Sequence, residues 1–252
     1  MNAAHVIASL ELPPGARVDR RVPKTLLLEH GAPTAADKRR INEGIEEVQW
    51  VATLKPTTIG VPALRDDVRE YLEIAVLRMA LRAEAKTDRL AELIHRAVPY
   101  PVFLLLAEDT RLTLSLAHKR KSQGQAGATV LDGEPVATTL TDFEAGGLRL
   151  EFHGALSLAR QPRADLYQLY QGWIDTIFAL LAARLTGRFA VATSRDQAAT
   201  RREALCECSR LDIEIARLRA LAANEKQLPR QVALNLELKR AEASQAAALS
   251  RL

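Results

Sequence analysis

The chain has 252 residues, with 35 Lys and Arg against 31 Asp and Glu, a formal net charge of +4. Apolar residues make up 48% and charged residues 26%, which are globular averages and exclude a collagen-like or intrinsically disordered chain. Only 4% of residues are aromatic, which argues against a single-strand nucleic-acid binder that depends on base stacking. The net charge is small for this length, so a sequence pI near 9.2 does not by itself indicate an anionic partner.

The first third of the chain is predicted to hold short strands around one helix. Thr25–Leu28 is a continuous apolar run and predicts a buried strand. Thr34 is the expected N-cap of a helix that extends to Val48, with Asp37 at the acidic position of a capping box. Two more short strands are predicted at Trp50–Leu54 and Thr57–Val61.

The middle third contains the strongest strand pattern. Residues 66–70 favour a short helix that passes into a strand ending at Arg82, although residues 68–82 also fit one amphipathic helix. A clear helical pattern follows at Lys86–Ala97, and Val102–Leu106 with Leu112–Leu116 predicts a hairpin around a turn. Weaker strands are predicted at Val136–Leu140 and Leu148–Phe152.

Helical periodicity dominates after Pro162. A long amphipathic helix is predicted up to Gly187, and two heptad-like segments then meet at a corner within Asn224–Arg230. Polar Gln245 interrupts the second apolar seam. The candidate interaction residues of these seams are Leu211, Ile215, Leu218, Leu234 and Leu238.

These elements predict an α/β fold of the α+β kind. We expect a mixed sheet with flanking helices, followed by a long helix and a C-terminal helical hairpin or coiled-coil arm. The expected domains are an α/β domain over residues 1–155, a connecting amphipathic helix over 156–192 and a helical arm over 193–252.

The expected compartment is the cytoplasm. Cys206 and Cys208 lie two positions apart in a helical segment, about 200° around it, which predicts two reduced thiols rather than a disulfide or a zinc site. Residues 1–14 lack the pattern of a signal peptide. The most apolar stretch, Trp173–Ala183, is too short to span a bilayer, so no membrane association is expected.

No common catalytic motif occurs in the sequence. It lacks G-x-x-x-x-G-K-[ST], G-x-G-x-x-G and G-x-S-x-G, so we assign no catalytic residue and expect neither a cofactor nor a bound metal. The alternative enzyme hypothesis is a nuclease centred on Glu108, Asp109 and Lys119, although their spacing does not fit an acid-x-Lys motif on one strand.

Basic residues supply the candidate anion contacts. A dense basic run at a strand end can meet phosphates or simply keep that end solvated. A lysine before a buried strand is either a positioned cation or a side chain that reaches solvent from the sheet edge. The candidate nucleic-acid or anion contacts are therefore Lys24, His118, Lys119, Arg120 and Lys121.

Several segments occur together in a recognisable order. They are Val22–Gly31, Lys38–Ile45, Trp50 with Leu54–Pro62, His95–Val102, Ser115–Arg120 and Asn235–Glu242. The chain thereby resembles one of the bacterial families defined only as a domain of unknown function. The resemblance implies a gene encoded near restriction-modification-like methyltransferases and helicases in phage-defence islands, and it transfers no active-site residue.

The leading hypothesis is a non-catalytic accessory or assembly subunit of a bacterial defence or DNA-processing complex. Its α/β domain would dock on a helicase or methyltransferase subunit, or on the DNA backbone. The helical arm would mediate assembly, with self-association as an option. The alternatives are a nuclease or other phosphate-ester enzyme, and a stand-alone nucleic-acid-binding protein whose binding weakens steeply as salt rises.

Overall fold

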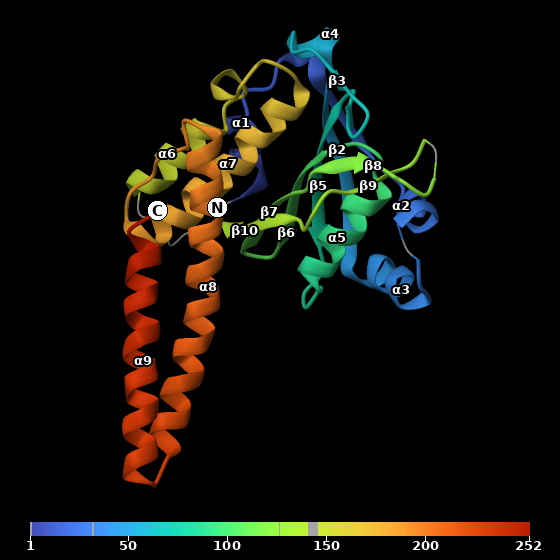
Figure 1. Cartoon of the computed structure of the whole chain (residues 1–252). Coiled ribbons are helices and arrows are strands. Elements are labelled where there is room, and N and C mark those ends of the chain that lie inside the picture. Colours follow the sequence, from blue (N-terminus) through green and yellow to red (C-terminus); the bar gives the residue numbers. More distant parts are fainter. Residues whose placement is uncertain (1, 32, 126, 141–145) are drawn as a thin grey trace. The chain divides into compact units, whose positions relative to one another are not determined.

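A computed structural model describes residues 2–31, 33–125, 127–140 and 146–252 (Figure 1). The chain divides into two compact units, Met1–Ile177 and Phe178–Leu252, and the long helix α7 (Leu166–Thr186) contributes to both. The first unit contains a mixed sheet with helices, and the second is formed by long helices. The predicted fold class is therefore confirmed.

A six-stranded sheet organises the first unit within the described residues. Its strand order is β1-β2-β5-β6-β7-β10, and only β5 and β6 run parallel. Two small antiparallel pairs, β3-β4 and β8-β9, lie outside this sheet. The strands are β1 (Arg17–Arg21), β2 (Ile45–Leu54), β3 (Leu64–Arg65), β4 (Glu70–Tyr71), β5 (Ile74–Leu81), β6 (Val102–Glu108), β7 (Arg111–Leu116), β8 (Lys119–Lys121), β9 (Thr129–Leu131) and β10 (Val136–Leu140).

Helices cover both faces of the sheet. Helix α5 (Thr87–Ala97) packs its apolar face, including Leu93, on alternate residues of β5 and β6 such as Leu77 and Leu104. On the opposite face, Phe103 meets Trp173 of α7 edge-on, with ring centroids 5.1 Å apart. The remaining helical elements of this unit are α1 (Ala3–Ser9), a 3-10 turn at Pro14–Ala16, α2 (Lys24–Gly31), α3 (Ala35–Gly44), α4 (Pro56–Ile59), α6 (Gly146–Leu156) and a 3-10 turn at Leu158–Arg160.

The second unit ends in an antiparallel helical hairpin, α8 (Arg195–Asn224) and α9 (Leu228–Leu249) (Figure 1). Polar bonds join the two helices: the Arg219 guanidinium lies 2.7 Å from a carboxylate oxygen of Glu242, and Gln245 donates to Asp212. The Gln245 amide that interrupts the seam therefore has a specific partner. Buried positions repeat every three or four residues along α8, namely Ala198, Arg201, Ala204, Cys208, Leu211, Ile215, Leu218 and Ala222.

Several elements confirm the prediction. The helix with Thr34 as N-cap exists, and the Thr34 side chain accepts a bond from the Asp37 amide. The ambiguous segment contains strand β5, and the helix before Pro99 and the β6–β7 hairpin form as expected. None of the described helices is both long enough and apolar enough to cross a membrane.

Two predicted strands are short helices instead. Residues 25–28 belong to α2, whose Leu27 is buried while Leu26 is exposed, because a short apolar run suits one buried helix face as well as a strand. Residues 57–61 contain α4, where Pro56 occupies the first turn and Gly60 ends the helix with φ 66°. This placement of Pro and Gly is typical of helix boundaries.

Three further predictions are corrected. The predicted strand at 148–152 is part of α6: Phe152 and Leu156, four residues apart, are buried while Leu150 is 73% exposed. The expected helix at 66–70 is a turn in which the Asp66 carboxylate accepts from two backbone amides. The helix predicted to reach Val48 ends at Gly44, because strand β2 begins at Ile45.

Replacing Trp173 tests the packing between α7 and the sheet. Trp173 is fully buried, and its indole N–H donates to the Leu156 carbonyl at 2.9 Å. We expect Trp173→Ala to lower the free energy of unfolding by about 3–5 kcal/mol, measured by urea denaturation. The exposed control Leu150→Ala should change it by less than about 0.5 kcal/mol, and equal effects of both substitutions would contradict this packing.

Candidate functional site

The predicted basic run does not form an open cationic patch. His118 is held between Tyr71, whose hydroxyl lies 2.6 Å from Nδ1, and Gln171, whose Oε1 lies 2.8 Å from Nε2. The Lys121 ammonium donates to the backbone carbonyl of Asp66. Arg120 is half-buried, and its one described hydrogen bond, to the carbonyl of Lys121, is long at 3.4 Å.

Lys119 is buried, with only 1% of its surface exposed. Its ammonium group donates to the carbonyls of His95 and Val98 at the C-terminal end of α5. The last carbonyls of a helix have no partner within the helix and carry partial negative charge, so a cation there is favourable. Burial lowers the pKa of Lys119 to about 8. Lys119 therefore caps a helix, and its ammonium faces the interior.

Lys24 makes a similar contact at another helix end. It begins α2, and its ammonium donates to the carbonyl of Ile45, which directly follows α3. Arg82 also binds there, donating to the carbonyls of Asn42 and Glu43 at 2.9 Å each. Burial, followed by the positive charges of Arg82 and Arg21, lowers the pKa of Lys24. Lys24 is thus a positioned cation whose described partners are backbone oxygens.

The predicted nuclease residues do not converge. Glu108 ends β6 and Asp109 lies in the turn before β7, whereas Lys119 follows the far end of β7. The six residues of β7 at about 3.3 Å each separate the acids from the lysine. The buried Lys119 ammonium also points to the α5 carbonyls. Glu108, Asp109 and Lys119 therefore do not meet in one site of the structure.

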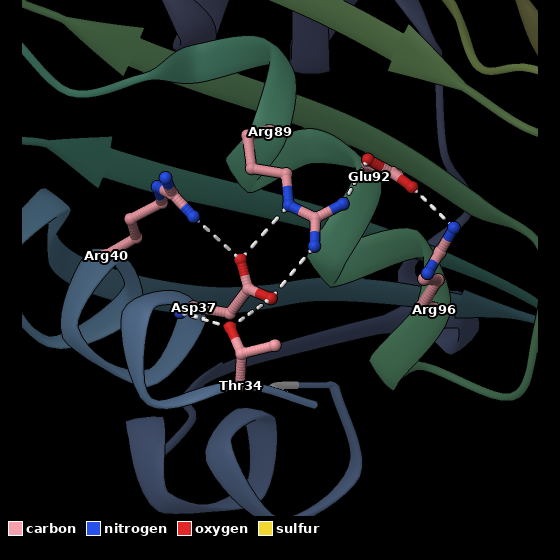
Figure 2. Close-up of polar contacts among 6 residues, drawn as sticks. All are labelled: Thr34, Asp37, Arg40, Arg89, Glu92 and Arg96. Carbon is pink, nitrogen blue, oxygen red and sulfur yellow. Dashed lines mark hydrogen bonds and ion pairs between the residues drawn. The ribbon is translucent and has the colours of Figure 1, made fainter.

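Among the described residues of the first unit, the densest ionic network joins α3 to α5 (Figure 2). The side chain of Asp37 is buried, and the Arg89 guanidinium binds its two oxygens at 3.1 and 2.8 Å. Arg40 and the Thr34 hydroxyl also donate to this carboxylate. These bonds, foremost the one from Arg89, lower the pKa of Asp37 to about 2.

Glu92 extends the network along α5. It accepts from Arg89 at 2.6 Å, and Arg96 lies 2.6 Å from its other oxygen (Figure 2). Every charge in this cluster faces an opposite charge, so the arrangement fixes two helices rather than leaving a guanidinium for a ligand. We conclude that this network is a structural clamp.

A hollow of about 660 Å³ lies beside α5, and Ser115 of β7 is among its lining residues. The Ser115 hydroxyl is 2.9 Å from Nε2 of His95. Burial, reinforced by the Lys119 charge, lowers the pKa of His95 to about 3, so its imidazole is neutral. Nucleophilic catalysis also needs an exposed hydroxyl and a group that orients the base. Ser115 is fully buried, and Nδ1 of His95 has no partner among the described residues.

The candidate interaction residues divide into two groups. Leu211, Ile215 and Leu218 are buried along α8, whereas Leu234 and Leu238 on α9 are partly exposed. The large apolar side chains of this hairpin that are exposed lie at other positions, which the heptad pattern did not identify. They are Ile213, Leu221, Leu228, Val232 and Leu236.

The sequence analysis did not identify the residues of the ionic network between α3 and α5. Arg89 and Glu92 resemble ordinary helix charges in the sequence, and Asp37, up to 55 positions away, is predicted only as part of a capping box. The available signal was the spacing of Arg89, Glu92 and Arg96 at three and four residues, which places them on one face of α5. No group of three or more His, Cys, Asp or Glu in the described ranges is arranged to hold a metal ion.

Together these features define a mixed α/β protein with a helical C-terminal hairpin, in which many charges stabilise helix ends. The chain belongs to the DUF4391 family, a domain of unknown function, whose family model matches residues 10–244. Comparisons with curated proteins and with solved structures found no match.

The buried Lys119 should produce a specific pH dependence. Its pKa is about 8 in the folded protein and 10.5 when unfolded, so the unfolded state binds more protons between these values. As the pH rises from 8 to 10.5, the free energy of unfolding therefore increases by up to about 3 kcal/mol because of the lowered pKa of Lys119. Urea denaturation across this range should show that rise as the difference between the wild type and Lys119→Met. An identical pH profile for both proteins would contradict it, and exposed Lys38→Met is the control.

The Asp37 clamp should be sensitive to acid. Its lowered pKa means that the carboxylate stabilises the fold above the ordinary value of 3.8, and this contribution is lost as pH falls towards about 2. Asp37→Asn should lower the thermal midpoint at pH 7 by several degrees and reduce the loss of stability between pH 4 and 2. Glu43→Gln, which removes only an exposed ion pair with Arg39, is the matched control on α3. Equal midpoints for the two variants would argue against the clamp.

Proposed function

We propose that this protein is a non-catalytic accessory subunit of a bacterial defence or DNA-processing complex. In this proposal, the hairpin of α8 and α9 docks on the methyltransferase or helicase subunit of that complex. The observation that carries it is a row of exposed apolar side chains on α9. Leu228, Val232 and Leu236 follow one another at intervals of four residues, and each is more than half exposed.

An interval of four residues places side chains on one side of a helix, on successive turns. Ala248 of α9 is fully buried and lies about 200° around the helix from Leu228, so the exposed row lies away from this buried position. A hairpin of two helices covers only one side of each helix. A row of apolar side chains on the uncovered side is favourably buried when a partner protein with an apolar surface docks on it.

The contacts of the basic run weigh against a stand-alone nucleic-acid binder. His118, Lys119 and Lys121 each bind groups of the chain itself, so most of their donor capacity is used within the fold. Of the five candidate contact residues, Arg120 is the one whose single described hydrogen bond is long, at 3.4 Å. Partner docking through apolar surface therefore has the better support.

The test is co-purification of the full chain with a methyltransferase subunit and a helicase subunit of the proposed complex. The triple variant Leu228→Gln, Val232→Gln and Leu236→Gln should reduce the amount of captured partner at least tenfold. Glutamine is a good helix former, so α9 should retain its helicity by circular dichroism. The matched control places glutamine at three exposed alanines of the same helix, Ala233, Ala243 and Ala247, and should capture the partner normally.

Three outcomes would overturn the proposal. The first is a strictly monomeric protein that ignores both enzymes and duplex DNA. The second is a homodimer that the triple variant converts to a monomer, measured by light scattering, because the row would then serve self-association. The third is equal partner capture by the wild type and the triple variant.

A further inference from the structure

A second hollow, of about 580 Å³, lies against the opposite face of the sheet from α5. Arg78 of β5 contributes to its lining, and its neighbours Leu77 and Met79 belong to the core under α5, so Arg78 points the other way. Arg17 of β1 and Arg111 of β7 also line it, together with residues of α1. We call this feature the arginine hollow, and it goes beyond the proposed docking function.

The three guanidinium groups differ in how they are paired. Arg17 has a carboxylate partner, Asp19, at 3.0 Å. Arg78 is half-buried, and its one described bond is a long contact of 3.5 Å to the side-chain oxygen of Gln49. Arg111 forms no ion pair within the described residues. Because each guanidinium carries five N–H donors in a rigid fork, Arg78 and Arg111 retain unused donors that face one cavity.

We propose that the arginine hollow binds the terminal phosphate of a small hydroxylated molecule, a sugar phosphate or a nucleoside monophosphate. Forked guanidinium groups match phosphate oxygens geometrically and form strong charge-assisted bonds with them. The lining holds three guanidinium groups against the two carboxylates of Asp19 and Asp109, so the hollow is net cationic. This charge suits a phosphate monoester, which carries nearly two negative charges at pH 7. Each phosphodiester of a nucleic-acid backbone carries only one, so a small monoester fits better than DNA or RNA.

The other lining residues suit the rest of such a molecule. Asp109, in the turn between β6 and β7, lines the hollow without forming a described ion pair, and its carboxylate is available to accept from a ligand hydroxyl. Ile7, Val51 and Leu112 supply apolar surface for a sugar ring or base. The volume also lies within the usual range of small-molecule sites, roughly 300–1,000 Å³.

Calorimetric titration of the full chain tests the proposal with four probes: ribose 5-phosphate, adenosine 5′-monophosphate, inorganic phosphate and adenosine. We expect both esters to bind and adenosine to fail. Inorganic phosphate should compete weakly with the two esters for the arginine hollow. Tighter binding of the nucleotide than of the sugar phosphate assigns the apolar surface to the base, and equal binding assigns the site to sugar phosphates.

Arg78→Gln and Arg111→Gln should each weaken ester binding roughly tenfold to a hundredfold, the usual effect of losing a charge-assisted bond. Arg20→Gln, at an exposed arginine of β1 outside the hollow, is the matched control and should bind normally. If Arg78→Gln fails to fold by circular dichroism, exposed Arg111→Gln provides the test. Absence of ester binding, binding of adenosine equal to its phosphate ester, or binding of a short DNA duplex but neither ester would overturn the proposal.

Discussion

The first unit depends on satisfying the carbonyls at the C-terminal ends of its helices. Lys119 binds the end of α5, while Lys24 and Arg82 bind the end of α3. Lys119 lies on β8, Lys24 begins α2, and Arg82 directly follows β5, so each bond also fixes one segment of the chain against a helix end. An unpaired buried carbonyl is costly, and a lysine reaching it from elsewhere in the fold satisfies both the hydrogen bond and the helix dipole.

The charge at Lys119 influences its surroundings. It opposes protonation of His95, which stays neutral and forms its described bond with Ser115. The strand containing Lys119 also brings its backbone amide to the Tyr71 hydroxyl, which in turn bonds to His118. A sequence of adjacent basic residues has thus become a series of internal contacts. A strongly basic local composition therefore serves largely to hold parts of the fold together.

The arginine hollow shows the opposite case. Arg78 and Arg111 lie 33 positions apart and form no dense run in the sequence, yet strands β5 and β7, on either side of β6, bring both to one cavity. The availability of a guanidinium depends on which acceptors the fold brings near it. Arg89 meets Asp37 and Glu92, whereas Arg78 meets only the side-chain amide of Gln49 in the described structure. Local charge density is therefore a poor guide to which charged groups are paired in this protein.

The sequence by itself determined the elements whose patterns are long and regular: α5, the β6–β7 hairpin, α7 and the two C-terminal helices. Their apolar periods extend over enough residues to separate a helix from a strand. The short runs at residues 25–28, 57–61 and 148–152 were assigned as strands and are helical, because a few apolar residues suit either structure. Only the tertiary structure decided which charged groups pair. The partners of Asp37, Lys119 and Arg78 come from distant segments, and burial or pairing is a property of that assembly rather than of local sequence.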